Sequence, residues 1–132
     1  MSKVVHFEIP ADNLDRARSF YGEVFGWRID TMSMPGGGEY TGLTTTAVDE
    51  QTMTPTEPGA INGGMTQRSE STPAPVITID VEDIDAALAQ IEAAGGKAVT
   101  SRTPIPGMGA YGYFRDTEGN VMGLWETTPS TS

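Results

Sequence analysis

The sequence repeats itself with a period of 70 residues. The two halves align without a gap, and in both an alternating apolar pattern is followed by a helical apolar stripe and a glycine. The aligned pairs are Phe7 and Ile77, Ile9 and Ile79, Leu14 and Ile84, Asp15 and Asp85, Ala17 and Ala87, and Gly26 and Gly96. Because these features share one offset, the sequence predicts a duplicated structural unit.

Each half predicts a strand, a helix and three further strands. In the first half we expect strands over 4–9, 27–32, 39–46 and 60–67, with PGGG at 35–38 as a turn and a helix from Asp12 to Gly26. In the second we expect strands over 76–81, 97–101, 110–115 and 121–126, with a turn over 103–109 and a helix from Asp83 to Gly95 and Gly96. Aspartate favours helix starts and glycine favours helix ends. The fold class is therefore α+β, with two βαβββ modules.

The chain has 132 residues and a mass of 14.0 kDa, which suits a single domain. We expect module 1 over about 3–67, a linker over 68–74, module 2 over about 75–126 and a frayed tail over 127–132. The N-terminus passes from one lysine into an alternating pattern, without the apolar stretch of a signal peptide. We therefore expect a cytoplasmic protein.

Charge and composition exclude several classes of function. There are 18 acidic against 8 basic residues, a formal net charge of −10, which repels phosphate backbones and anionic lipid. We expect neither a nucleic-acid partner nor a membrane. The chain has no cysteine and one histidine, which excludes disulfides, thiolate metal sites and any site with two imidazoles in one chain.

Strand alternation predicts which residues face a binding cleft. If Phe7 and Ile9 lie under the first helix, His6 and Glu8 point to the other face of the sheet. The same reasoning places Ile77 and Ile79 under the second helix. The residues that it leaves opposite are Val76, Thr78 and Asp80. Two curved half-sheets would join these faces into a concave cleft lined by His6, Glu8, Thr78 and Trp125.

Tyrosine and tryptophan extend this predicted cleft. Tyr111, Tyr113 and Trp125 alternate with Phe114 and Leu124, so they face the cleft if the latter two are core. Such a wall could stack on a planar or cationic ligand, and the acidic composition favours a cation. Packing between subunits is the alternative role for these aromatic residues. Trp27 suits the core or an interface better than a ligand site.

Three segments make the chain resemble the vicinal oxygen chelate superfamily, which includes glyoxalase I, bleomycin-resistance proteins and extradiol dioxygenases. They are HFEIPADNLDRARSFYGEVFGW, VEDIDAALAQIEAAGG and PGMGAYGYFRDTEGNVMGLWE. The resemblance runs from about Val4 to Glu126. It implies a glyoxalase/bleomycin-resistance-like fold, a curved mixed sheet with a concave cleft, and a homodimer.

The resemblance also implies where a metal would bind. Enzymes of the superfamily hold a divalent metal with four side chains from the first and last strands of each module. The matching positions are His6, Gly64 (or Asn62), Val76 and Gly123. Only His6 offers a ligand at its expected place, and one donor is too few. We therefore expect the protein to bind no cofactor. The alternative is that it binds a divalent metal ion, which would be Ni, Zn, Mn or Fe.

Other uses of the same residues stay open. His6, Glu8 and Asp80 could form a relocated metal site, or His6 and Glu8 could act together as a general base. Both side chains could instead be structural, with Glu8 accepting hydrogen bonds or pairing with His6. The expected function is binding of a small molecule without a metal. The alternatives are a metal-dependent lyase or isomerase of the glyoxalase I type, and a non-enzymatic dimeric interaction domain.

Overall fold

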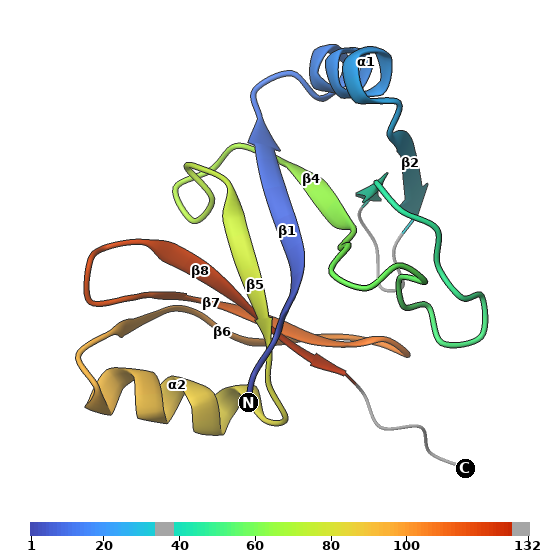
Figure 1. Ribbon diagram of the computed structural model, residues 1–132. Coiled ribbons are helices and arrows are strands. Elements are labelled where there is room, and N and C mark those ends of the chain that lie inside the picture. Colours follow the sequence, from blue (N-terminus) through green and yellow to red (C-terminus); the bar gives the residue numbers. More distant parts are fainter. Residues whose placement is uncertain (34–38, 128–132) are drawn as a thin grey trace. The chain divides into compact units, whose positions relative to one another are not determined.

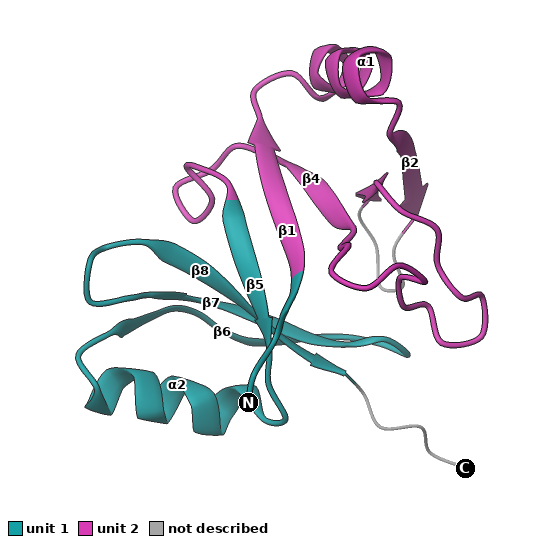
Figure 2. Cartoon of the chain, in the orientation of Figure 1, with its two compact units in different colours: residues 1–5, 76–132 teal, residues 6–75 magenta. Residues whose placement is uncertain are grey.

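A computed structural model describes residues 1–33 and 39–127 of the chain (Figure 1). The predicted PGGG turn and most of the predicted frayed tail lie outside these described residues. Figure 2 divides the chain into two compact units: unit 1 comprises residues 1–5 and 76–132, and unit 2 comprises residues 6–75. Each unit has its own helix, its own set of strands and its own apolar core.

Unit 2 contains a helix and four sheet strands. In chain order these are residues 6–11 of β1 (Val4–Ala11), α1 (Leu14–Phe25), β2 (Arg28–Ser33), β3 (Glu39–Thr44) and β4 (Gly63–Gln67). The strand order is β2-β3-β4-β1. Strand β4 is parallel to β1 and antiparallel to β3, so the sheet is mixed.

Unit 1 repeats this arrangement. Its elements are β5 (Val76–Asp80), α2 (Ile84–Ala93), β6 (Lys97–Ile105), β7 (Gly109–Arg115) and β8 (Val121–Thr127). The strand order is β6-β7-β8-β5, with β5 and β8 parallel, which matches unit 2 strand for strand. The predicted α+β class with two βαβββ modules is confirmed.

The 70-residue offset ends between the third and fourth strands of the modules. The connection before β4 runs over residues 45–62, whereas β7 and β8 are joined by residues 116–120. Beyond this point, the strand register shows which residues of the two modules correspond. Glu8 is in register with Gly64, and Thr78, its equivalent, is in register with Gly123. Gly64 and Gly123 are therefore equivalent positions.

The helix ends follow local capping rules, with one correction. The cap of α1 is Asn13, whose Oδ1 accepts a hydrogen bond from the Arg16 backbone N–H at 2.9 Å, and not Asp12. Asp12 instead forms an ion pair with Arg68 at 2.9 Å. Asp83 caps α2 as predicted, and Gly26 ends α1 in the left-handed conformation. Neither helix is long and apolar enough, within the described part of the chain, to cross a membrane.

Each unit has an apolar core between its helix and its sheet. In unit 2, Phe7 and Ile9 pack with α1 against the buried core, as predicted. In unit 1, Phe114 and Leu124 are core, also as predicted. The buried core residues are Ala11, Leu43 and Met65 in unit 2, and Ile84, Leu88, Ala110, Phe114 and Leu124 in unit 1.

Two predictions for unit 1 are wrong. Ile77 is 47% exposed and does not lie under α2, because the contacts of that helix run to β6, β7 and β8. Ile79 alone of the predicted pair packs against the core. The strand predicted over 97–101 continues to Ile105, so the turn is confined to residues 106–108.

Candidate functional site

In unit 2, the face of β1 away from the core carries two ionisable side chains. His6 and Glu8 are two residues apart and half-buried, on the side opposite Phe7 and Ile9. Tyr40 of β3 joins them: its hydroxyl lies 3.5 Å from His6 Nε2 and donates a hydrogen bond to the Gly63 carbonyl at 3.4 Å. These three residues, His6, Glu8 and Tyr40, are called the His6 face below.

A glycine allows Tyr40 to reach His6. Strand β4 lies between β1 and β3, and Gly64 is in register with Glu8 on one side and with Gly42 on the other. A Cβ atom added at Gly64 would lie 2.6 Å from the Tyr40 hydroxyl oxygen, closer than real Cβ contacts. The Tyr40 ring therefore occupies the space that any other residue at position 64 would fill.

Burial keeps the ring groups of the His6 face uncharged at neutral pH. Burial, with the negative charge of Glu8 as a smaller cause, raises the pKa of Tyr40 to about 12. Burial also lowers the pKa of His6. Tyr40 is thus a hydrogen-bond donor, and neutral His6 has one donor and one acceptor nitrogen. Together with the Glu8 carboxylate, they offer both kinds of hydrogen-bonding group.

The other predicted cleft residues belong to unit 1. Tyr111 lies opposite Trp125 in the β7–β8 register, Tyr113 lies opposite Gly123, and the two tyrosine ring centroids are 5.9 Å apart. Trp125 donates its indole N–H to the Thr127 hydroxyl at 3.1 Å. Tyr111, Tyr113 and Trp125 are half-buried and are called the aromatic face below.

Thr78 lies in the next strand from this face and is buried, with 5% of its surface exposed. It pairs in register with Gly123, and its hydroxyl has no hydrogen-bond partner among the described residues. A Cβ added at Gly123 would lie 2.7 Å from that hydroxyl oxygen. Thr78 thus fills the space at Gly123, much as Tyr40 does at Gly64.

The structure groups the predicted residues by unit. His6 and Glu8 come together in unit 2, and Thr78 and the aromatic face come together in unit 1. Sequence reasoning missed Tyr40. The available signal was its place two residues before Gly42 in the predicted strand, which puts both on one face, together with the unexplained glycine pair at 63 and 64.

The residues at the implied metal positions do not fit a metal. Gly64 and Gly123 have no side-chain donor, and Val76 is a buried apolar residue with 1% exposure. Asn62 is committed elsewhere, since its side-chain oxygen accepts hydrogen bonds from the backbone of Thr45 and Thr46 at 2.7 and 3.0 Å. Within residues 1–33 and 39–127, no three His, Asp or Glu side chains gather closely enough to hold an ion.

Comparison with known proteins identifies the family. The Glyoxalase/Bleomycin resistance protein/Dioxygenase superfamily model matches residues 3–124. A glyoxylase-like domain-containing protein of Didymella fabae is 32% identical over 122 residues, covering 89% of this chain and 88% of that protein. CFP32 of Mycobacterium tuberculosis, provisionally named a glyoxylase, is 30% identical over 111 residues, covering 83% of this chain but 40% of that protein.

A further relative is the anthracycline biosynthesis protein DnrV of Streptomyces peucetius. It is 25% identical over 130 residues, which cover 90% of this chain and 45% of that protein. The chain therefore spans less than half the length of DnrV and of CFP32.

Solved structures share the fold. A hypothetical protein of Bacillus halodurans superposes with a TM-score of 0.65 at 15% identity, covering 99% of this chain and 98% of that one. A methylmalonyl-CoA epimerase of Streptomyces coelicolor gives 0.64 at 18% identity, covering 98% and 97%. At these identities the likeness concerns the fold alone. From the family match and its extent, the chain belongs to the glyoxalase/bleomycin resistance protein/dioxygenase superfamily.

Proposed function

We propose that this protein binds a planar, cationic small molecule without a metal ion. The observation that supports the proposal best is the replacement of a metal ligand by a tyrosine at Gly64. Gly64 occupies a position implied for a metal ligand but has no side chain, and the neutral phenol of Tyr40 fills this space beside His6. The result is a set of hydrogen-bonding groups where a metal enzyme would present metal donors.

The His6 face suits a ligand with a positive charge and hydrogen-bonding groups. Glu8 is half-buried and its carboxylate would pair with a cation. The Tyr40 hydroxyl donates to the Gly63 carbonyl, and its oxygen would accept a hydrogen bond from a ligand donor. Neutral His6 could accept from a ligand hydroxyl or ammonium group. Half-buried polar groups of this kind orient a ligand more strongly than fully solvated ones.

The aromatic face of unit 1, considered by itself, could hold a planar ligand. Tyr111, Tyr113 and Trp125 are half-buried rings on adjoining antiparallel strands. Rings in this position can stack on a flat molecule or face a cation. One relative is named an anthracycline biosynthesis protein. Anthracyclines combine a planar ring system with a cationic amino sugar, so we include them among the ligands proposed for this chain.

Doxorubicin is a direct probe of the proposal, because its fluorescence reports on binding. We expect saturable binding to the wild-type protein. Glu8→Gln should weaken it about tenfold, the effect of losing a charge-assisted hydrogen bond, and should leave binding of the uncharged aglycone unchanged. Trp125→Ala tests the aromatic face of unit 1 by itself and should weaken binding of the planar aglycone. Binding that does not saturate, or equal loss of both ligands in Glu8→Gln, would contradict the proposal.

The metal question needs its own measurement. Protein equilibrated with Ni²⁺, Zn²⁺ and Mn²⁺ and then desalted should retain far less than one ion per chain by elemental analysis. His6→Ala should leave that amount unchanged, because one imidazole does not make a site. Retention of one ion per chain, lost in His6→Ala, would favour the metal-dependent lyase or isomerase instead.

A further inference from the structure

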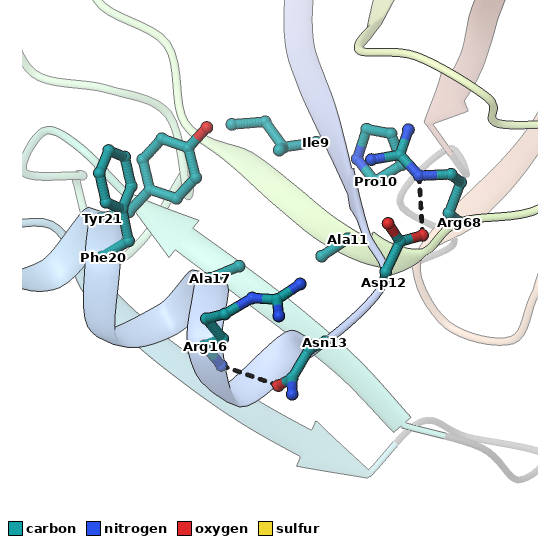
Figure 3. Close-up of a pocket in the computed structure, with 10 residues that line it drawn as sticks. All are labelled: Ile9, Pro10, Ala11, Asp12, Asn13, Arg16, Ala17, Phe20, Tyr21 and Arg68. Atoms are coloured by element: carbon teal, nitrogen blue, oxygen red, sulfur yellow. Dashed lines mark hydrogen bonds and ion pairs between the residues drawn. The ribbon is translucent and has the colours of Figure 1, made fainter.

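Unit 2 has a pocket that no residue of the His6 face lines. A pocket of about 340 Å³ lies between the end of β1 and the start of α1 (Figure 3). Ile9 lines it, and Ile9 belongs to the core side of β1, whereas Glu8 belongs to the other. The lining residues are Ile9, Pro10, Ala11, Asp12, Asn13, Arg16, Ala17, Phe20, Tyr21 and Arg68.

The inner wall of this pocket is apolar. Ile9, Ala11 and Ala17 belong to the core of unit 2, and Tyr21 stacks on the neighbouring aromatic residues of the same core. Phe20 adds a ring that is 53% exposed. The volume lies at the lower end of the range for small-molecule pockets, roughly 300–1,000 Å³. A wall of this kind takes the hydrocarbon part of a small ligand.

The rim of the pocket is cationic in an otherwise acidic protein. Arg16 and Arg68 are two of only 8 basic residues in the chain, and Asp12 is the one acidic residue in the lining. Figure 3 shows Arg16 extending from α1 toward the end of β1, where Asp12 and Arg68 lie. The rim therefore carries a net positive charge.

The two arginines differ in how they are held. Arg68 is fixed by its ion pair with Asp12 at 2.9 Å and by donating to the Pro73 carbonyl at 2.7 Å. The guanidinium of Arg16 has no acidic partner within 4.0 Å among the described residues. Arg68 is thus pre-oriented, while Arg16 is available to pair with an incoming anion in the two-pronged geometry that carboxylates favour.

We propose that this pocket is a second binding site, which takes a small apolar monocarboxylate. The hydrocarbon part would lie against Ile9, Ala17 and Phe20, and the carboxylate would pair with Arg16, assisted by Arg68. The proposal does not depend on the ligand of the His6 face, because none of His6, Glu8 and Tyr40 lines the pocket.

Octanoate is a suitable probe, and octanamide is its uncharged control of nearly equal size. Titration of ¹⁵N-labelled protein should move the backbone amide signals of Ile9, of residues 11–21 and of Arg68 along saturable curves. For a ligand of this size in an open pocket we expect a Kd on the order of 1 mM. Octanamide should bind about tenfold more weakly, because it lacks the charge-assisted bond to Arg16.

Three variants test the site. Arg16→Gln should weaken octanoate binding about tenfold, and Arg68→Gln should also weaken it. Arg28→Gln is the matched control, because Arg28 is an exposed arginine of unit 2 outside the pocket and should leave the affinity unchanged. His6→Ala should also bind octanoate normally, which separates this site from the proposed function.

Four results would overturn the proposal. They are the lack of a saturable shift, equal binding of octanoate and octanamide, equal weakening by Arg16→Gln and Arg28→Gln, and shifts centred outside the pocket. Each would show that general charge or general hydrophobic association, and not this pocket, accounts for any effect.

Discussion

The two modules share a backbone arrangement and differ in what they place at equivalent positions. Both carry a buried glycine in the last strand, Gly64 in unit 2 and Gly123 in unit 1, in register with the first strand. In unit 2 the space is taken by Tyr40, a long side chain from another strand. In unit 1 it is taken by Thr78, a short side chain from the register partner itself. The two modules thus share a backbone arrangement, but the side chains that occupy the space beside the equivalent glycines differ.

The two helices also differ, in how deeply their side chains are buried. Helix α2 buries Ile84 and Leu88 in the core of unit 1, with 0% and 8% exposure. Helix α1 has no residue that is fully buried, and its Phe20, Val24 and Phe25 are more than half exposed. Unit 1 therefore concentrates its helix–sheet packing in a few fully buried side chains, whereas unit 2 relies on partly buried ones.

The largest effect should come from shortening Ile84. Ile84→Ala leaves a cavity at a fully buried position and should lower the free energy of unfolding by about 2–5 kcal/mol. The matched change is Leu14→Ala at the equivalent position of α1, which is only half-buried and should cost about 1–2 kcal/mol. Denaturant unfolding measures both. A loss for Leu14→Ala as large as that for Ile84→Ala would remove the distinction between the helices.

A smaller effect is expected from adding a methyl group at the paired glycines. Gly123→Ala should cost about 1–3 kcal/mol, because the new Cβ meets the short, buried Thr78 side chain. Gly64→Ala should cost about 1 kcal/mol or less, since Tyr40 can swing its ring away.

A double variant checks the cause of this difference. Thr78→Ala removes the hydroxyl that the new methyl group meets, so Thr78→Ala combined with Gly123→Ala should recover most of the stability in denaturant unfolding. If the double variant is as unstable as the sum of the two single changes, contact with Thr78 is not the reason.

The smallest effect concerns charge at the His6 face. Glu8→Gln should lower the pKa of Tyr40 below about 12 but leave it above 10, because burial is the larger cause of the shift. A raised pKa in the folded state gives stability that is complete below pH 10 and is lost as the pH rises toward about 12. The variant should therefore narrow the pH range, above pH 10, over which this stability is lost. NMR titration of the Tyr40 ring carbon measures it, and Glu39→Gln, an exposed neighbour, should change nothing.

Local pattern was a good guide to the elements and their core-facing sides. The period of two placed Phe7 and Ile9 under α1, and the helical period placed Ile84 and Leu88 in the core of unit 1. The cap of α1 was predicted one residue early, at Asp12 in place of Asn13. Both residues can cap a helix. In the structure Asn13 makes the capping hydrogen bond, whereas Asp12 pairs with Arg68, the residue that follows β4.

Ile77 and Tyr40 show where local pattern fails. The pattern of β5 is the same as that of β1, but the helix of unit 1 does not cover the start of its strand, so Ile77 is exposed. Tyr40 reaches His6 across an intervening strand, which depends on the register of three strands. Neither fact is written in the periodicity of one segment.

The pattern of residue types therefore predicted the two-module α+β architecture and the apolar side of most elements. The resemblance to the superfamily added the expected metal positions, most of which lack a side-chain donor. Tertiary structure decided that the Tyr40 ring lies over Gly64, that Thr78 is buried against Gly123, and that Arg16 and Arg68 line one pocket. The physical reason is the sequence separation over which each kind of interaction acts. Periodicity and capping act over a few neighbouring residues, whereas strand register and side-chain packing join residues that lie far apart in the chain.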